Sequence, residues 1–306
     1  MRSSCLSRGS LHGGVGVAGA LVVGCVLAGC GPGEGPIWPV GGDPQRLSST
    51  FGPRLQVGRE MAYDFHRGID IPAPEGTSVL AIADGVVTRA GDDAGYSDTM
   101  VQVEHCGDDG CRWSNYLHLA EACVEVGDEV DAGDVVGLSG IAESGDEQLH
   151  FEIREGRSTQ GYAVHPLRVL PGLQWAPPTV SIVAVDEEAS GGAAVEVEVG
   201  TIGVDPALVR VEVVTRDRGT DATLGERVFD TEAWNREYTL EEDPGLIDTP
   251  EIDGIRVEPA PFTHGSVAYG LRVRFSGLGA VSAGREMGVT VKAVDAYGVV
   301  SEASLP

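Results

Sequence analysis

The chain contains two histidines and an aspartate whose side chains suit a divalent metal. His66 and Asp70 are four residues apart in the stretch YDFHRGIDIPAPEG, and His150 lies in DEQLHFEIREG. Gly68 and Pro72 argue against a helix around the first pair, so we expect a turn that leads into a strand. Two imidazoles and one carboxylate are the ligand count of a catalytic zinc site whose fourth position stays open. The sequence therefore predicts a Zn²⁺ site at His66, Asp70 and His150.

Further polar side chains share the faces of the predicted strands. In DEQLHFEIREG polar and apolar residues alternate, which places Gln148 on the same face as His150. His118, in NYLHL, also lies on a polar strand face, and Tyr116 two residues earlier is a candidate groove residue whose alternative role is packing. A histidine that is not a ligand could donate a hydrogen bond to a developing oxyanion or move a proton. We therefore take His118 as a candidate catalytic residue, and Gln148 raises the question whether it stands where a catalytic group should be.

Short strands, cut by Gly and Asp turns, must position these side chains. Between residues 47 and 173 the segment TSVLAIADGVVTRAG predicts two strands around a turn, and DTMVQVEH with RWSNYLHLA predicts a hairpin. Residues 179–306 contain a series of further strands, a number that is typical of an immunoglobulin- or fibronectin-like sandwich. We expect an all-β protein of two domains, residues 47–173 and 179–306, and no convincing site in the second.

The composition limits the classes of partner. The 306 residues carry a formal net charge of -26, which argues against nucleic acid because no basic patch could offset that field. Glycine is plentiful, with 44 residues, and aromatic residues make up only 6%, which favours β structure with many turns over helical bundles.

The N-terminal segment looks like an export signal. Arg2 and Arg8 precede an apolar run over residues 15–27, which is shorter than the ~20 residues that a membrane-spanning helix needs. The following LAGC resembles the lipobox of bacterial lipoproteins, and a plain secretory signal is the alternative. The resemblance implies a signal peptide over residues 1–29 and lipidation of Cys30. It also implies a Gly/Pro-rich linker over residues 30–46 and a lipid-anchored protein on the periplasmic side of the inner or outer membrane of the bacterial envelope.

Export permits disulfide bonds. In HCGDDGC, Cys106 and Cys111 lie at the shoulders of a predicted hairpin tip, close enough to bridge, which makes Cys123 the odd cysteine. A bond between Cys111 and Cys123 is the alternative. Cys5 and Cys25 would leave with the signal peptide.

Several motifs occur in an order that resembles the lysostaphin/LytM-type zinc endopeptidases of bacterial cell walls. They are STFGPR, FHRGIDIPAPEGTSVLAIADGVV, NYLHL, VGDEVDAGDVVGLSG, LHFEIR and HPLRVL, and the match covers roughly residues 48–173. The resemblance implies a LytM-type (duplicated hybrid motif) β domain with a groove and with zinc held by His66, Asp70 and His150. It also implies hydrolysis of peptide bonds in peptidoglycan, with His118 as a catalytic histidine.

One position departs from this family pattern. The family has His-x-His on its last strand, whereas this chain has Gln148, Leu149 and His150. A glutamine can hold a water by hydrogen bonds, but it cannot act as a base, and loss of a general base costs ~10²–10⁴ in rate.

Three functions therefore stay open. The first is a zinc peptidase in which His118 is the principal catalytic side chain and Gln148 orients water. The second is a non-hydrolytic module that binds peptidoglycan or regulates a cell-wall amidase, although such members of the family tend to lose zinc ligands as well. The third is a structural envelope lipoprotein whose histidines are fortuitous.

Overall fold

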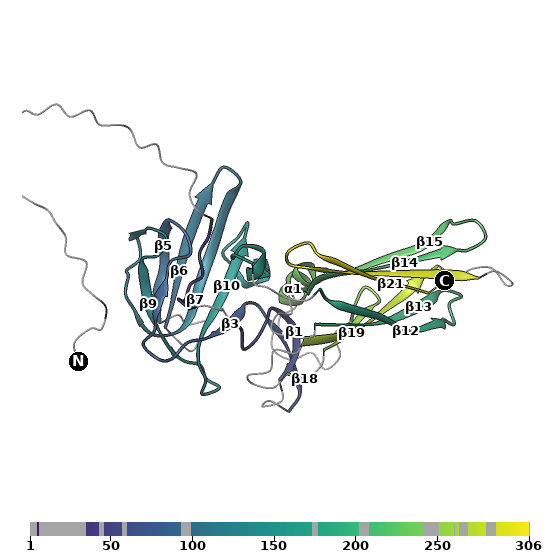
Figure 1. Cartoon of the computed structure of the whole chain (residues 1–306), viewed down its shortest axis with the longest axis horizontal. Coiled ribbons are helices and arrows are strands. Elements are labelled where there is room, and N and C mark those ends of the chain that lie inside the picture. Colours follow the sequence, from purple (N-terminus) through teal and green to yellow (C-terminus); the bar gives the residue numbers. More distant parts are fainter. Residues whose placement is uncertain are drawn as a thin grey trace, which may run out of the picture.

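The computed structural model describes two β units that lie end to end along the long axis, with α1 and β1 between them (Figure 1). The described residues are 5, 35–42, 46–56, 60–92, 99–172, 177–201, 208–240, 251–259, 261–262, 269–279 and 286–305. The expected signal peptide, apart from Cys5, and the expected lipidation site Cys30 lie outside these residues. In the part of the chain that is described, no helix has the length and apolar character that a membrane crossing requires.

The first unit is built on a nine-stranded sheet with the order β11-β10-β9-β7-β6-β5-β8, to which β3 is added on β10 and β4 on β9. Its strands are β3 (Ile69–Pro72), β4 (Ser78–Leu80), β5 (Gly85–Asp92), β6 (Thr99–Gly107), β7 (Gly110–Ala122), β8 (Glu129–Val130), β9 (Val135–Ile141), β10 (Glu147–Glu155) and β11 (Ala163–Val164). Two 3-10 turns, η2 (Gln160–Tyr162) and η3 (Pro166–Arg168), follow β10. The alternating residues Leu149, Phe151 and Ile153 of β10 are fully buried in its core, as their spacing predicts.

A separate three-stranded sheet joins the two units. It consists of β1 (Gly52–Gln56), β2 (Ala62–His66) and β18 (Pro261–Phe262), in the order β18-β1-β2. β1 pairs with β2 in antiparallel fashion and with β18, from the second unit, in parallel. The side chains of Phe51, Tyr63 and Phe65 belong to the same buried cluster as the core of the second unit.

The second unit is a sandwich of two sheets, in agreement with the expected all-β class. One sheet has the order β12-β13-β19-β17-β16 and the other β15-β14-β20-β21. The strands are β12 (Thr179–Glu187), β13 (Ala193–Thr201), β14 (Leu208–Asp217), β15 (Thr223–Asp230), β16 (Glu251–Ile252), β17 (Ile255–Pro259), β19 (Tyr269–Leu278), β20 (Met287–Asp295) and β21 (Val300–Leu305). Every second residue of β13, at Val195, Val197 and Val199, is buried between the sheets.

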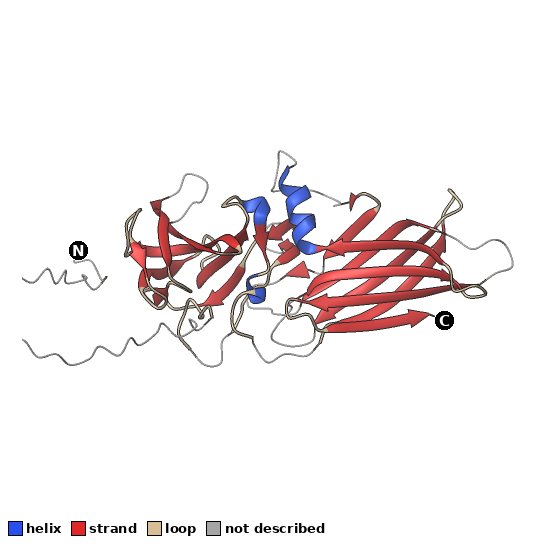
Figure 2. Ribbon diagram, turned by 90° about the horizontal axis from the view of Figure 1, so that it is seen from above, coloured by secondary structure: helices blue, strands red, loops and turns tan. Residues whose placement is uncertain are grey.

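One helix, α1 (Thr231–Leu240), interrupts the second unit and was not expected from the sequence. Asp230 caps it, because its Oδ1 accepts hydrogen bonds from the backbone N–H groups of Glu232 and Ala233 at 3.0 and 2.9 Å. Trp234 and Asn235 are buried on its inner face. The helical segments, blue in Figure 2, gather at the junction of the two units, where α1 packs against η2.

Part of the expected linker packs on the first unit instead of standing free. The backbone N–H of Ile37 donates to Ile82 O, Leu80 N–H donates to Pro39 O, and Val40 forms a bridge with Val79. Val40 is only 3% exposed, so its burial holds this segment against β4.

Two disulfides are present in the described residues. Cys106 and Cys111 are bonded at the tip of the β6–β7 hairpin, and Cys111 therefore does not pair with Cys123. Cys123 is bonded to Cys5, with 5.6 Å between the two Cα atoms. This corrects one expectation for the unprocessed chain, namely that Cys123 is the odd cysteine. The sequence could not reveal this bond because 118 residues separate its cysteines.

Candidate metal centre

Two sheets supply the side chains of the candidate site. His66 is the last residue of β2 in the three-stranded sheet, whereas Asp70 lies on β3 of the nine-stranded sheet after a two-residue turn. β3 pairs with β10 in a register that sets Asp70 directly opposite His150. Side chains that are opposite each other in an antiparallel pair lie about 5 Å apart at Cβ. The turn and this register together bring the three predicted ligands to one place.

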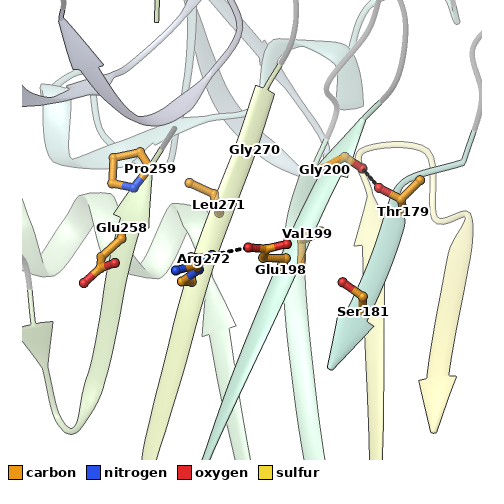
Figure 3. Close-up of a pocket in the computed structure, with 10 residues that line it drawn as sticks. All are labelled: Thr179, Ser181, Glu198, Val199, Gly200, Glu258, Pro259, Gly270, Leu271 and Arg272. Carbon is orange, nitrogen blue, oxygen red and sulfur yellow. Dashed lines mark hydrogen bonds and ion pairs between the residues drawn. The ribbon is translucent and has the colours of Figure 1, made fainter. Parts of the chain in front are cut away.

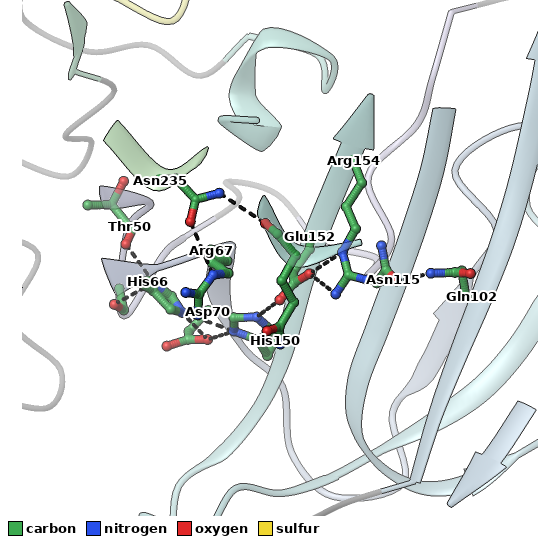
Figure 4. A network of polar contacts seen from close by, with 12 residues as sticks. Thr50, His66, Arg67, Asp70, Gln102, Asn115, His150, Glu152, Arg154 and Asn235 are labelled. Atoms are coloured by element: carbon green, nitrogen blue, oxygen red, sulfur yellow. Dashed lines mark hydrogen bonds and ion pairs between the residues drawn. The ribbon is translucent and has the colours of Figure 1, made fainter. Parts of the chain in front are cut away.

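The ligand atoms of these residues converge (Figure 4). His150 Nδ1 lies 2.8 Å from Asp70 Oδ1 and 3.0 Å from His66 Nε2, and His66 Nε2 lies 3.2 Å from Asp70 Oδ1. Donor atoms at zinc bond lengths of ~2.0–2.1 Å in a tetrahedron are separated by about 3.3 Å, so a zinc ion fits this donor set with small adjustments. The three residues are at most 9% exposed. Burying polar groups without partners is costly, so the burial of all three side chains is consistent with a site that binds a cation.

A backbone carbonyl orients the ring of His66. Its Nδ1 lies 2.6 Å from the carbonyl oxygen of Thr50, so Nδ1–H donates there and Nε2 remains the metal-facing nitrogen. Burial and the charge of Arg54 lower the pKa of His66, although Asp70 opposes them. The ring is therefore neutral at neutral pH, which is the form that a metal binds.

A carboxylate orients the ring of His150. Its Nε2 lies 3.2 Å from Glu152 Oε1, which leaves Nδ1 to face Asp70 and His66. Arg154 donates to Glu152 Oε2 from Nε at 2.9 Å and from Nη2 at 2.6 Å. Against the effect of burial, hydrogen bonds that His150 donates to Asp70 and Glu152 raise the pKa of His150 to about 9.

The Glu152–Arg154 pair is itself buried, with both residues at 2% exposure. Burial opposes ionisation of Glu152, yet the charge of Arg154 and the contact with His150 lower the pKa of Glu152 to about 2. This pair was not predicted as part of the site. Alternation along the strand could have indicated it, because Glu152 lies two residues after His150 on the same face.

Gly68, in the turn between β2 and β3, leaves room for the His150 ring. A Cβ atom at this position would lie 2.4 Å from Phe151 O and 2.9 Å from Cε1 and Nε2 of His150. These separations are shorter than any that side-chain carbons tolerate, so this glycine is required for the turn to pass this close to β10.

His118 lies beside this centre with a strained backbone. Its ring centroid is 5.8 Å from that of His150, and it is partly exposed. Its φ of 60° falls in the left-handed region, which is uncommon for a residue other than glycine and persists only where the surroundings enforce it. Gly140 of β9 permits the arrangement, because a Cβ there would lie 2.9 Å from His118 O and 2.7 Å from Ala120 N.

Tyr116 does not line a groove, and that expectation was wrong. It is fully buried in the core of the first unit, and its ring packs on Phe151 at a centroid distance of 5.3 Å. Its hydroxyl accepts a hydrogen bond from Ile82 N–H at 3.0 Å, and burial raises its pKa to about 12. The positive φ at His118 interrupts the regular alternation of β7, so the two side chains do not share a face.

Gln148 is held by a serine. Ser48 Oγ donates to Gln148 Oε1 at 3.1 Å and lies 3.3 Å from the backbone oxygen of Asp70, which ties the glutamine to β3 near the ligands. Gln148 is only 4% exposed. Glu147, by contrast, is exposed and contacts the backbone N–H of Glu75 at 3.4 Å, so it does not replace a base at position 148.

Two other features of the described residues do not contribute to this centre. Glu104, Cys106 and Cys111 lie close enough for a metal, but the two sulfur atoms form a disulfide. The second unit has an open pocket of about 450 Å³ on the sheet that contains β12, β13, β19 and β17 (Figure 3). Arg272 and Glu198 pair across it, and none of the candidate site residues lines it.

Comparison with known proteins places this β unit in a family. Residues 64–166 match the model of Peptidase family M23. Cell division protein DipM of Caulobacter vibrioides is 36% identical over 138 residues, which cover 44% of this chain and 20% of DipM. The DD-carboxypeptidase/endopeptidase Mpg of Neisseria meningitidis is 34% identical over 145 residues, or 47% of this chain and 30% of Mpg. Murein hydrolase activator NlpD of Escherichia coli is 31% identical over 134 residues, or 44% of this chain and 31% of NlpD.

The chain thus spans less than a third of the length of these relatives. Among solved structures, the catalytic domain of lysostaphin from Staphylococcus simulans is 27% identical and has a TM-score of 0.35, with 40% of this chain and 90% of that domain covered. The catalytic domain of the prophage-encoded M23 protein EnpA from Enterococcus faecalis is 30% identical, also with a TM-score of 0.35, and 42% and 94% are covered. The expected resemblance to the lysostaphin/LytM type is confirmed: residues 64–166 form a peptidase family M23 domain, and this matched region contains all three candidate metal ligands.

Proposed function

We propose that this protein is a zinc-dependent endopeptidase that cleaves peptide bonds in peptidoglycan. The observation that carries the proposal is the convergence of His66 Nε2, Asp70 Oδ1 and His150 Nδ1, each buried and each ring oriented by its own hydrogen-bond partner. A ligand set that served only structure would include a fourth protein ligand, and none lies in the cluster among the described residues. The names of the relatives Mpg and NlpD support peptidoglycan as the substrate class.

The chain's own residues suit peptide hydrolysis around a metal. A bound zinc ion would polarise the scissile carbonyl and lower the pKa of a water molecule. His118, at the edge of the centre, would donate a hydrogen bond to the carbonyl oxygen as it gains negative charge. Gln148 would orient the attacking water, because Ser48 occupies its Oε1 and leaves the Nε2 hydrogens as donors. The glutamine cannot accept a proton, so proton transfer falls to His118 or to solvent.

Purified cell wall tests this proposal. The zinc-loaded chain should release new peptide ends from peptidoglycan, and His150→Ala should release none because it removes a ligand. Gln148→His should raise the rate by up to ~10²–10⁴, since it restores a base beside the metal. Full metal occupancy without new peptide ends in either the parent chain or the Gln148→His variant would refute the catalytic proposal.

A non-hydrolytic regulator is the second candidate, and the geometry of Gln148 favours it. A buried glutamine that is tied to Ser48 forms a stable polar contact at a position where hydrolysis would need a base. The relatives include a protein named as a murein hydrolase activator. A cell-wall amidase assay with and without this chain decides the matter. No stimulation, together with no binding to peptidoglycan, would remove this candidate.

We further propose that the mature protein is exported and anchored to the bacterial envelope through a lipid on Cys30. The lipobox-like LAGC supports this proposal. Cleavage before Cys30 would remove Cys5, so the Cys5–Cys123 bond belongs to the unprocessed chain and Cys123 becomes the odd cysteine after processing. Mass spectrometry of the envelope-bound protein should show a chain that begins at an acylated Cys30. An intact residue 1 would contradict the proposal.

A further inference from the structure

The second unit is linked by strand pairing to β2, the strand that carries His66. β2 pairs with β1, and β1 pairs in parallel with β18 of the second unit. Asp70 and His150, in contrast, lie on the nine-stranded sheet. The candidate metal centre is therefore assembled across two sheets, of which the one that presents His66 is continuous with the second unit.

The core packing shows the same continuity. Phe65, directly before His66, and Phe51, directly after Thr50, pack edge to face with ring centroids 5.2 Å apart. Both belong to the buried cluster of the sandwich. Thr50 is the residue whose carbonyl orients His66, so the ligand and its hydrogen-bond partner are each flanked by a side chain anchored in that core.

Helix α1 holds the His66 segment on both sides. Before His66, Tyr63 Oη accepts a hydrogen bond from Trp234 Nε1 at 2.9 Å, and both side chains are buried. After His66, Arg67 Nε donates to Asn235 Oδ1 at 3.1 Å (Figure 4). Adjacent residues of one helix thus contact the chain three residues before the ligand and one residue after it.

Asn235 also ties α1 to the first unit. Its Nδ2 donates to Gln160 O of η2 at 3.0 Å, so one fully buried amide bridges the turn after His66 and the segment after β10. The position of Asn235 is itself determined by the sandwich, since Trp234 packs edge to face on Phe229 of β15 at 5.4 Å. A displacement of the sandwich would therefore be transmitted to both ends of the Tyr63–Arg67 segment.

We propose that the C-terminal sandwich is a positioning element of the metal centre, in which Trp234 and Asn235 of α1 set the place of His66 relative to Asp70 and His150. The sandwich is then more than a spacer, because metal coordination tolerates ligand errors of only about 0.2 Å. This inference rests on the metal site proposed above, and it adds that the second unit determines how tightly that site binds.

Zinc competition titrations on the full-length chain test the inference. Asn235→Ala removes both bridges and Trp234→Phe removes the hydrogen bond to Tyr63 while keeping a ring in the core. Each should weaken zinc binding about 10–100-fold, the range for residues that orient ligands, and should change the absorption spectrum of the cobalt-substituted protein. Asn235→Asp keeps the acceptor for Arg67 but loses the donor to Gln160 O, so it should recover only part of the affinity that Asn235→Ala loses.

Two control variants separate positioning from general destabilisation. Arg168→Ala breaks the ion pair with Glu232 of α1, at 2.5 Å, which joins the units without touching the His66 segment. Glu237→Ala changes an exposed residue of the same helix. Both should keep the parent zinc affinity, even where Arg168→Ala lowers the melting temperature of the metal-free protein.

The outcomes distinguish this inference from the proposed function. If the folded parent chain binds no zinc, the proposed metal site fails and the inference fails with it. If the parent binds zinc and folded Asn235→Ala and Trp234→Phe bind it equally well with an unchanged cobalt spectrum, the inference alone is overturned. Weakening of Arg168→Ala to the same extent as Asn235→Ala would also overturn it, because domain docking in general would then be the cause.

Discussion

Replacing Gly68 with alanine should damage the metal centre through a single added methyl group. The new Cβ would meet Phe151 O at 2.4 Å and the His150 ring at 2.9 Å. A carbon atom in ordinary van der Waals contact stays about 3.5–4.0 Å from its neighbours. The ring would have to retreat by about 0.5–1 Å, or the β2–β3 turn would have to move away by a similar distance.

Either movement exceeds the tolerance of the centre. Retreat of the ring separates His150 Nδ1 from Asp70 and His66, and displacement of the turn moves the segment that connects those two ligands. Ligand distances in a zinc site hold to within about 0.2 Å, so we expect zinc affinity to fall by at least about tenfold. Overpacking should also destabilise the fold by about 1–3 kcal/mol.

Gly107→Ala is a matched control for this experiment. Gly107 ends β6, has nothing within 4 Å of its added Cβ and does not have a positive φ. Zinc affinity would be measured by competition with a chelator, and stability by urea unfolding of the metal-free protein. A folded Gly68→Ala variant with the parent zinc affinity would refute the view that the turn packs directly against the ligand ring.

Three further predictions follow from groups around and away from the centre. Glu152→Gln removes the buried carboxylate that neutralises the charge of Arg154 and should cost about 3–5 kcal/mol in urea unfolding, and an unchanged midpoint would contradict the buried ion pair. Burial lowers the pKa of His105 below its usual 6.5, so the unfolded chain binds the proton more readily. The stability contributed by His105 should be complete above about pH 6.5 and fall at lower pH, and His105→Asn should remove that slope. Thiol titration under denaturing, non-reducing conditions should find Cys123 reactive in the processed protein and blocked in the unprocessed one, and a blocked Cys123 in both would contradict removal of Cys5.

The candidate metal ligands could be identified from the sequence because residue type and strand pattern carry most of the information. His66, Asp70 and His150 are the kinds of side chain that zinc selects, and the alternation around His150 correctly indicated a strand. The turn at Gly68 was predicted from the low helix propensity of glycine and proline. The spacing did not predict the register of β3 on β10, because that register depends on pairing between segments 80 residues apart.

The errors arose where tertiary structure overrides local pattern. Tyr116 and His118 are two residues apart on one strand and so were expected on one face, but the left-handed backbone at His118 breaks that rule. Helix α1 was missed because a ten-residue helix with a weak apolar pattern is stabilised by its docking more than by its own propensity. Its capping residue, Asp230, was the available signal.

Strand β10 explains why the polar partners that come from other segments could not be derived from sequence spacing. A strand with one wet face would leave Gln148, His150 and Glu152 in water, whereas every residue of β10 between Glu147 and Glu155 is buried. Each buried polar group without a partner costs ~1–3 kcal/mol, so the fold must bring partners to this face. Arg154 lies on the same strand, two residues from Glu152, whereas Ser48 and Asp70 are 100 and 80 residues from the side chains that they contact. The polar face of a strand therefore predicts that partners exist, while the packing of distant segments determines which residues from other parts of the chain they are.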